Sequence, residues 1–340
     1  MSKHQTTLKD IAKRLGLSVS TVSRALRNHP AINLDTIKRV KAEAEALEYF
    51  PNSVARSLQQ KSTKTIGVIV PEIRHDFFSS VIDGIEDRAY QDGYTIIVSK
   101  SNEDYRREVL NTRSMVSNRV AGIIASVAQT TLNGDHFLAV KKRGVPIVLF
   151  DRVLDEVDVC KVIVDDYQGA YHSTMHLLQS GFRRIAHLAG PLHLNISKER
   201  LRGYRAALEE SGYQYDKDLV VQVELDEEHG MKGTQQLLSM EKRPDAIFAV
   251  NDPVAVGAHK EIRLSGYRIP DDIGISGFSN NPITELIEPQ LTTVDQHGYQ
   301  MGQTAADMLL DEIITRHPGE QPRVRVLKTE LIIRDSSRRK

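Results

Sequence analysis

Apolar residues near the start of the chain recur at helical spacing and predict two short helices. The first helix has Thr7 as its cap and Asp10 as the capping-box partner, and it ends at Gly16. A second helix is predicted from a cap at Ser18 to Leu26. The link between the two helices is short and contains glycine, which is typical of a helix-turn-helix motif.

A third helix is predicted over residues 34–48, with Asn33 as its cap. Its apolar residues should close the core of a small three-helix head, and they are Ile37, Val40, Ala44 and Leu47. After Pro51, residues 53–60 have helical propensity but almost no apolar face. Isolated helices this short are marginal in water, so we expect this segment to be unfolded when it is alone.

From Thr65 onward the pattern changes to short apolar runs separated by helical stretches. This spacing is typical of parallel sheets in an α/β fold. Two sets of strands are predicted, which indicates a body of two similar α/β lobes: 66–70, 95–98, 122–125 and 145–150, then 184–188, 219–223, 246–250 and 273–277.

Three further segments predict that the chain crosses between the lobes. They are residues 162–164, 291–294 and a strand over 324–333. We therefore predict the following domains: a head at 1–50, a hinge and linker at 51–63, and a body at 64–340, with lobe one at about 64–163 and 294–317 and lobe two at about 164–293 and 318–336.

Charge is distributed unevenly along the chain. Residues 1–64 contain twelve Lys plus Arg and five Asp plus Glu, a net charge of +7, and the remaining 276 residues carry −7. A basic segment on a neutral chain is the footprint expected of a nucleic-acid-binding arm, because contacts with phosphates release counterions.

The second predicted helix carries the candidate contacts to DNA. In a helix-turn-helix, the first turn of this helix enters the major groove, which places Val19, Ser20, Thr21, Ser23 and Arg24 nearest to the bases. Arg24 is the strongest candidate for a guanine contact, whereas the hydroxyl groups could bond phosphate instead. The alternative is that these serines and the threonine are ordinary residues of a solvated helix start.

The run LKDIAKRLGLSVSTVSRAL, followed by residues 49–52 and 54–58, resembles the LacI/GalR family of bacterial repressors, and the resemblance extends over essentially the whole chain. It implies a homodimer with a hinge helix that folds on the operator and inserts Leu58 into the minor groove, with Asn52, Ala55 and Arg56 beside it. A dimer would bind a pseudopalindromic operator. The alternative is a solvated linker whose leucine packs on the body.

Ligands of open parallel sheets bind beyond the carboxyl ends of the strands. The residues that follow the predicted strands, together with the helix containing residues 198–204, should therefore line one cleft: Asp76, Phe77, Phe78, Asp151, Arg152, Asn251, Asp252, Phe278, Ser279 and Asn280.

The resemblance adds roles to some of these residues. Arg200 matches the family's arginine three residues before a glycine, Asp151 and Asn251 match positions that bond sugar hydroxyls, and Phe77 and Phe78 match an aromatic pair at the entrance. For Arg200, the alternative is a surface salt bridge.

One motif departs from the family. Many relatives have Gly-Tyr-Asp-Asp where this chain has Gly-Phe-Ser-Asn at residues 277–280. A carboxylate that would accept hydroxyl groups is therefore missing. The effector stays open: a sugar or sugar derivative leads, followed by a purine or nucleoside, and a phosphorylated carrier protein is a third possibility.

Enzyme and transporter functions fit the sequence less well. No GxGxxG follows the first strand of either lobe, no GxxxxGK[ST] occurs, and the pair His172 and His176 lacks the glutamate of a zinc-protease motif. We expect no catalysis, cofactor or metal. With no apolar leader or membrane-length run, and one cysteine, Cys160, the protein is expected to be cytoplasmic and without intrachain disulfides. A solute-binding protein would share the fold, but the basic head argues against it.

Overall fold

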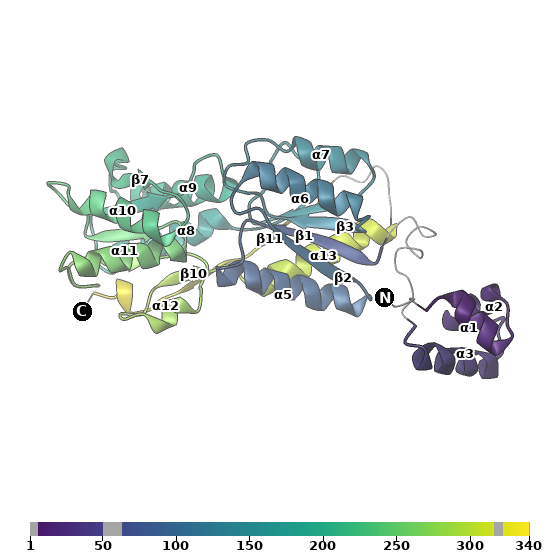
Figure 1. Cartoon of the computed structure of the whole chain (residues 1–340). Coiled ribbons are helices and arrows are strands. Elements are labelled where there is room, and N and C mark those ends of the chain that lie inside the picture. Colours follow the sequence, from purple (N-terminus) through teal and green to yellow (C-terminus); the bar gives the residue numbers. More distant parts are fainter. Residues whose placement is uncertain (1–5, 50–62, 316–321, 340) are drawn as a thin grey trace. The chain divides into compact units, whose positions relative to one another are not determined.

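The computed structural model describes residues 6–49, 63–315 and 322–339 and divides into two compact units, 1–63 and 64–340. Figure 1 shows the elements of both units. Each unit is described by itself. Within the described residues, no helix combines the length and the apolar character needed to cross a membrane.

The head consists of α1 (Leu8–Leu15), α2 (Val19–Leu26) and α3 (Leu34–Ala46). Its caps confirm the local predictions. The Thr7 N–H donates to Asp10 Oδ2 at 2.8 Å, the Thr21 N–H to Ser18 Oγ at 3.1 Å, and the Asp35 N–H to Asn33 Oδ1 at 2.9 Å. The helices share one small core of buried side chains, Ile11, Ala12, Val22, Ala25, Ile37, Val40 and Ala44.

Lobe one is built on a parallel six-stranded sheet with the order β11-β5-β4-β3-β1-β2. Its strands are β1 (Thr65–Val70), β2 (Thr95–Lys100), β3 (Gly122–Ala125), β4 (Ile147–Phe150), β5 (Cys160–Val164) and β11 (Val324–Leu327). One face is covered by α5 (Asp76–Gln91) and α13 (Gly298–Thr315), and the other by α6 (Tyr105–Ser117) and α7 (Asp135–Lys142), as Figure 1 shows.

The two helices on the first face approach each other closely at a pair of glycines. A Cβ added to Gly84 of α5 would lie 2.1 Å from the carbonyl oxygen of Tyr299, and one added to Gly302 of α13 would lie 2.1 Å from that of Val81. Only glycine fits at such distances, so these two positions set how tightly α5 and α13 pack.

Lobe two repeats the arrangement with a parallel four-stranded sheet in the order β7-β6-β8-β9. Its strands are β6 (Ile185–Ala189), β7 (Val220–Gln222), β8 (Ala246–Ala249) and β9 (Gly274–Ser276). The helices α8 (Asp166–Gln179) and α9 (Asn195–Glu210) cover one face, and α10 (Glu227–Leu238) and α11 (Asp252–Leu264) cover the other. Both sheets therefore confirm the predicted parallel α/β lobes.

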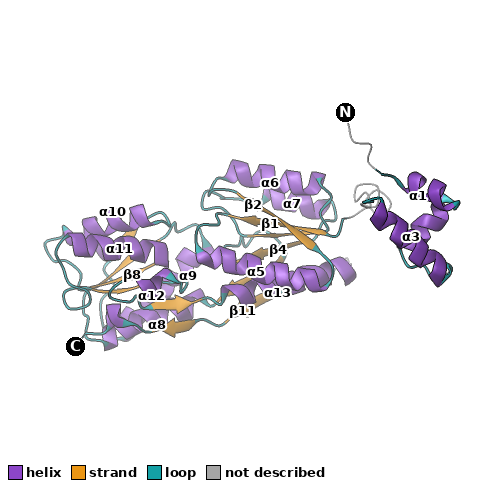
Figure 2. Cartoon of the chain, turned by 60° about the horizontal axis from the view of Figure 1, so that its bottom comes forward, coloured by secondary structure: helices purple, strands orange, loops and turns teal. Residues whose placement is uncertain are grey.

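The chain passes from β5 into α8, and it returns to lobe one at α13 after the short helix α12 (Ile283–Leu286) and β10 (Thr293–Asp295). The chain crosses between the lobes a third time between β11 and β12 (Glu330–Ile332). The strand β12 pairs antiparallel with β10 (Figure 2). Two 3-10 turns, Lys217–Leu219 and Asp335–Ser337, complete the described elements.

The last crossing corrects two predictions. The single strand predicted over 324–333 is two strands, β11 and β12. The range 318–336 was assigned to lobe two by the sequence pattern, but β11 pairs with β5 and belongs to the sheet of lobe one. A four-residue apolar run does not indicate which strand it will pair with. The partner of β11 is β5, which lies about 160 residues earlier in the sequence.

Candidate functional site

The predicted DNA-reading surface of the head lies on the first turns of α2. Val19 is 41% exposed, Ser20 and Arg24 are exposed, and Thr21 and Ser23 are half-buried. The Ser18 Oγ lies 2.8 Å from both Ser20 Oγ and Thr21 Oγ1, so hydroxyl groups gather at this helix N-terminus. Such a terminus suits a phosphate, and Arg24, further along the same helix, is left as the candidate for a base contact. The hinge candidates Asn52, Ala55, Arg56 and Leu58 lie outside the described residues.

Loops at the carboxyl ends of the strands in both lobes line one inner cavity, as the rule for parallel sheets predicts. Its free space is about 30 Å³, which is close to the volume of one or two water molecules. Seven of the eleven residues expected in the cleft line it together with five residues that were not predicted: Phe77, Phe78, Asp151, Arg152, Arg200, Asn251 and Ser279, then His75, Ile196, Pro253, Asn281 and Gln296.

Asp151 lines this cavity from lobe one. It follows β4 with a left-handed backbone, φ 57°, which is uncommon for a residue other than glycine. Its Oδ1 accepts a hydrogen bond from Gln296 Nε2 at 3.2 Å. Burial raises the pKa of Asp151, while the neighbouring guanidinium groups of Arg152 and Arg200 oppose that rise.

Arg152 is buried beside Asp151 and is held by an acid of its own lobe. Its Nη1 lies 2.9 Å from both carboxylate oxygens of Glu103, and its guanidinium carbon lies 5.6 Å from the centre of the Phe78 ring. Its buried Nε has no hydrogen-bond partner among the described residues. Arg152 is therefore a paired charge whose Nε, 3.9 Å from Asp151 Oδ2, makes no hydrogen bond within the described residues.

Arg200 lies on the lobe-two side and is 1% exposed. Its Nε and Nη2 lie 2.8 and 2.7 Å from Asp166 Oδ1, and its Nη1 donates to the Val250 carbonyl at 2.6 Å. The guanidinium stacks on Phe278 at 3.7 Å. The surface-salt-bridge alternative is therefore wrong, because the pair is buried. Burial raises the pKa of Asp166 to about 7, although Arg200 opposes this shift.

Asn251 and Asp252, which follow β8, differ in whether they line the cavity. Asn251 lines the cavity and caps α11: its Oδ1 accepts from the Val254 N–H at 2.9 Å, and its Nδ2 donates to the Leu225 carbonyl at 3.1 Å. Asp252 is fully buried and lines neither hollow described here, which corrects its assignment to the ligand site. Its oxygens accept from Thr293 Oγ1 at 2.6 Å and from the Asn281 N–H at 2.7 Å, and burial raises its pKa to about 6.

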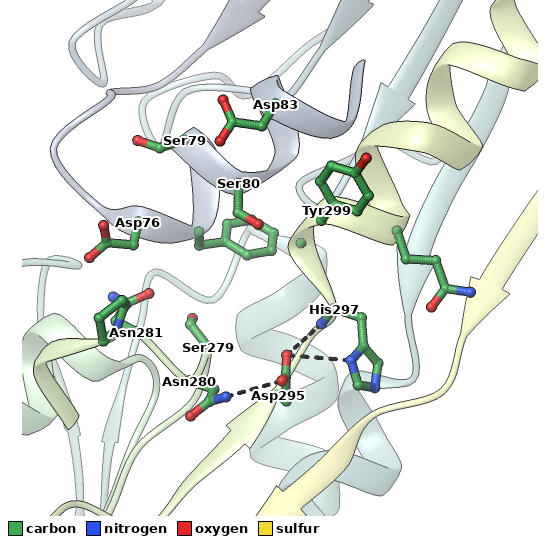
Figure 3. A pocket seen from close by; sticks show the side chains of 14 residues that line it. Asp76, Ser79, Ser80, Asp83, Ser279, Asn280, Asn281, Asp295, His297 and Tyr299 are labelled. Carbon is green, nitrogen blue, oxygen red and sulfur yellow. Dashed lines mark hydrogen bonds and ion pairs between the residues drawn. The ribbon is translucent and has the colours of Figure 1, made fainter. Parts of the chain in front are cut away.

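An outer hollow of about 580 Å³ adjoins the inner cavity and shares Phe77, Ser279 and Asn281 with it. Asp76 lines this outer hollow rather than the inner cavity. Figure 3 shows Asp295 between its two partners: Asn280 Nδ2 donates to it at 3.0 Å, and the His297 N–H at 2.7 Å.

Of the five residues that were not predicted, His75, Pro253 and Asn281 lie next to predicted residues, whereas Gln296 and Ile196 lie away from the strand ends. Gln296 lies on a crossing segment, Ile196 on the first turn of α9, and Asn281 beyond the motif that was compared with relatives. The sequence signal that could have indicated Gln296 is that it is a polar residue next to a predicted crossing between the lobes.

Outside the cavity, the described residues contain one group of side chains with the composition of a metal site. The ligand atoms of Glu224, Asp226 and His229 lie within 4.8 Å of one another. Asp226 caps α10 and accepts from the His229 N–H at 2.9 Å and from its Nδ1 at 2.8 Å. These internal bonds account for the arrangement without an ion.

Comparison with known proteins agrees with this geometry. A family model described as bacterial regulatory proteins of the lacI family matches residues 7–52, and one described as periplasmic binding proteins and sugar binding domain of the LacI family matches residues 63–335. The ribose operon repressor of Haemophilus influenzae is 31% identical over 330 residues, which cover 97% of this chain and 98% of the relative.

Two solved structures match the chain over nearly its full length. The lac repressor dimer bound to operator and the anti-inducer ONPF has a TM-score of 0.85 and 28% identity, covering 98% of this chain and 99% of that one. The complex of the transcriptional regulator CelR with cellobiose has a TM-score of 0.74 and 28% identity, covering 98% and 100%. The chain therefore belongs to the LacI family of bacterial regulatory proteins, and it is a DNA-binding transcriptional regulator.

Proposed function

We propose that this regulator is a homodimeric repressor that acts in the bacterial cytoplasm, binds a pseudopalindromic operator, and responds to a small neutral effector in the cleft. The observation that carries the proposal is the presence, in one chain, of an exposed helix with the position of a DNA-reading helix in a helix-turn-helix and of a cavity lined by the strand-end loops of two α/β lobes. Ligand-dependent movement of the lobes would change the spacing of the hinge segments and hence DNA affinity.

On the DNA side, support comes from charge and from exposure. The first 64 residues carry +7, and Arg24 on α2 is exposed. Two heads of a dimer would then occupy half-sites about one helical turn apart, with Leu58 of each chain entering the minor groove between them. The lac repressor, a structural relative of this chain, is bound to its operator as a dimer.

On the effector side, the pairing of charges favours a neutral ligand with several hydroxyl groups. Glu103 holds Arg152 and Asp166 holds Arg200, so neither arginine presents an uncompensated charge. Asp151, Gln296 and the free Arg152 Nε are left to exchange hydrogen bonds with hydroxyl groups. A sugar or sugar derivative fits these groups, and the CelR relative binds cellobiose.

The second candidate effector is a purine or nucleoside. Phe77 and Phe78 provide aromatic surface at the cavity, but their rings already contact each other edge-to-face at 5.2 Å, and Phe78 also packs on Phe150 at 6.3 Å. Stacking a base between them would require both rings to move. We therefore rank it behind a sugar, and a phosphorylated carrier protein third.

The test is to incubate the purified chain with fragmented genomic DNA at moderate ionic strength and to sequence the fragments that it retains, with and without ribose, cellobiose, adenosine or hypoxanthine. We expect enrichment of pseudopalindromic fragments and a change in their retention with one sugar. Response to adenosine or hypoxanthine alone would select the second candidate. No enrichment over competitor DNA under any condition would reject the proposal. Sedimentation equilibrium would test the dimer.

A further inference from the structure

Asn195, the first residue of α9 in lobe two, makes both of its side-chain hydrogen bonds to the backbone of lobe one. Its Nδ2 donates to the Asp151 carbonyl at 3.0 Å, and its Oδ1 accepts from the Val153 N–H at 3.0 Å. One amide side chain therefore engages two peptide groups of the loop that follows β4. These bonds form only while α9 and that loop are side by side.

The loop that Asn195 holds includes the left-handed backbone of Asp151. The left-handed conformation at φ 57° is unfavourable for most residues with a side chain, and at Asp151 hydrogen bonds from outside the residue hold it. Asn195 Nδ2 supplies that support at the carbonyl, while Gln296 bonds the carboxylate. The two contacts together fix where the Asp151 carboxylate lies in the inner cavity.

Apolar side chains surround these hydrogen bonds. Leu194 and Ile196, on either side of Asn195, are 2% and 4% exposed and belong to the same buried cluster as Val153 and Leu154 of lobe one. Asn195 itself is half-buried, so these apolar neighbours shield the two bonds in part.

The size of the inner cavity connects this contact to ligand entry. Its free space of about 30 Å³ is far below the roughly 300–1,000 Å³ of pockets that hold small molecules. To hold a ligand of that size, the inner cavity must widen, and a widening that moves α9 away from the loop after β4 would separate Asn195 from Asp151 and Val153.

We propose that Asn195 is a positioning residue that links closure of the two lobes to the placement of the Asp151 carboxylate. This inference rests on the proposed function only where it concerns regulation, because the effector is proposed to bind beside Asp151. The contact itself, and its effect on closure, are testable without any ligand.

The experiment measures the distance between the lobes in the full chain. Spin labels are attached to Arg113→Cys on α6 and Gln235→Cys on α10, two exposed helical positions, in a Cys160→Ser background. Double electron–electron resonance then gives the distance distribution, and dilution with unlabelled chain suppresses pairs between subunits. We expect a short-distance population without ligand.

Asn195→Ala removes both bonds. Because two hydrogen bonds between the lobes are lost, the ratio of short to long distances should fall roughly 5- to 150-fold. Asn195→Asp is the second variant: it keeps the acceptor for the Val153 N–H but loses the donor to Asp151, and it should shift the distribution in the same direction.

The matched control is Asn111→Ala. Asn111 is also half-buried and donates to the Lys100 carbonyl at 3.0 Å, but both residues lie in lobe one, so the distribution should not change. An unchanged distribution in Asn195→Ala, or an equal shift in Asn111→Ala, would overturn the proposal. Failure to find an effector would bear on the proposed function and leave this measurement intact.

Discussion

Arg200 directs two nitrogens, Nε and Nη2, at the same oxygen of Asp166, Oδ1, over 2.8 and 2.7 Å, and both side chains are buried. The pair is thus part of the packed wall of the cleft, as well as a candidate ligand contact. Any variant of Arg200 affects the folded state and the effector site together, and the two effects must be measured separately.

Arg200→Ala should lower the free energy of unfolding by roughly 3–5 kcal/mol, because it leaves the Asp166 carboxyl buried without its arginine. Burial already raises the pKa of Asp166 to about 7, and loss of the guanidinium removes the main opposition to that rise. A carboxyl whose pKa is raised by folding stabilises the fold at low pH and loses that contribution as the pH rises. The deficit measured by urea denaturation should therefore be smaller at pH 5 than at pH 8.

The double variant Arg200→Met with Asp166→Leu separates stability from binding. It replaces both charges with apolar groups and should regain most of the lost stability. If Arg200 also contacts the effector, this double variant still binds operator but no longer responds to the effector. An intact response in the double variant would place the ligand contact elsewhere.

His187 should make the body sensitive to acid. It is fully buried, with its ring stacked on Phe248 at 4.8 Å and on Tyr204 at 5.2 Å, and burial lowers its pKa from 6.5 to about 4. Because the folded state resists protonation, stability contributed by neutral His187 is lost as the pH falls from about 6.5 through about 4, to a total of roughly 3 kcal/mol.

The measurement for His187 is urea denaturation of the wild type and of His187→Phe at several pH values between 7.5 and about 4. The phenylalanine keeps an aromatic ring in the stack but cannot take up a proton. The difference between their stabilities should shift in favour of His187→Phe as the pH falls. Parallel curves would show that His187 does not cause the acid sensitivity.

Arg24→Ala should weaken binding to the operator by roughly 1–3 kcal/mol, because Arg24 is exposed on the helix predicted to read the major groove. Binding of the effector should be unaffected, since the proposed effector cavity lies in the other unit. Fluorescence anisotropy with operator and random duplexes gives both affinities. An equal loss on random DNA would reduce Arg24 to a phosphate contact.

Gly84→Ala should destabilise the body by about 1–3 kcal/mol or more, because the added methyl group would lie 2.1 Å from the Tyr299 carbonyl and force α5 away from α13. Glu86→Ala is the control, an exposed position on the same helix that should change stability by less than about 0.5 kcal/mol. Thermal unfolding of both variants checks the comparison. Equal melting temperatures would mean that the helices adjust without cost.

Features that depend on neighbouring residues were predictable from the sequence. The caps at Thr7, Ser18 and Asn33 are hydrogen bonds between a side chain and a backbone N–H group two or three residues away. A short stretch of sequence is therefore enough to predict them. The strands and the general place of the cavity were also predictable, because buried parallel strands leave continuous apolar runs and their carboxyl ends share one edge.

Features set by distant contacts were not predictable in this way. Asp252 follows β8, as a ligand residue should, yet Thr293 and the Asn281 backbone bond its carboxyl and bury it. Gln296 reaches Asp151 from 145 positions further along the chain. No local pattern distinguishes such residues from other polar residues beside a strand, because their roles arise only when the lobes are assembled.

The placement of β11 also bears on how the protein is made. During synthesis, the segment with β1 to β5 leaves the ribosome first. The strand that completes their sheet, β11, leaves only after all of lobe two. Until residues 324–327 emerge, the edge of β5 has open backbone hydrogen-bonding groups on a nascent chain. A truncation that stops before residue 324 would keep that edge permanently unpaired, so such fragments should aggregate even though every earlier strand is present.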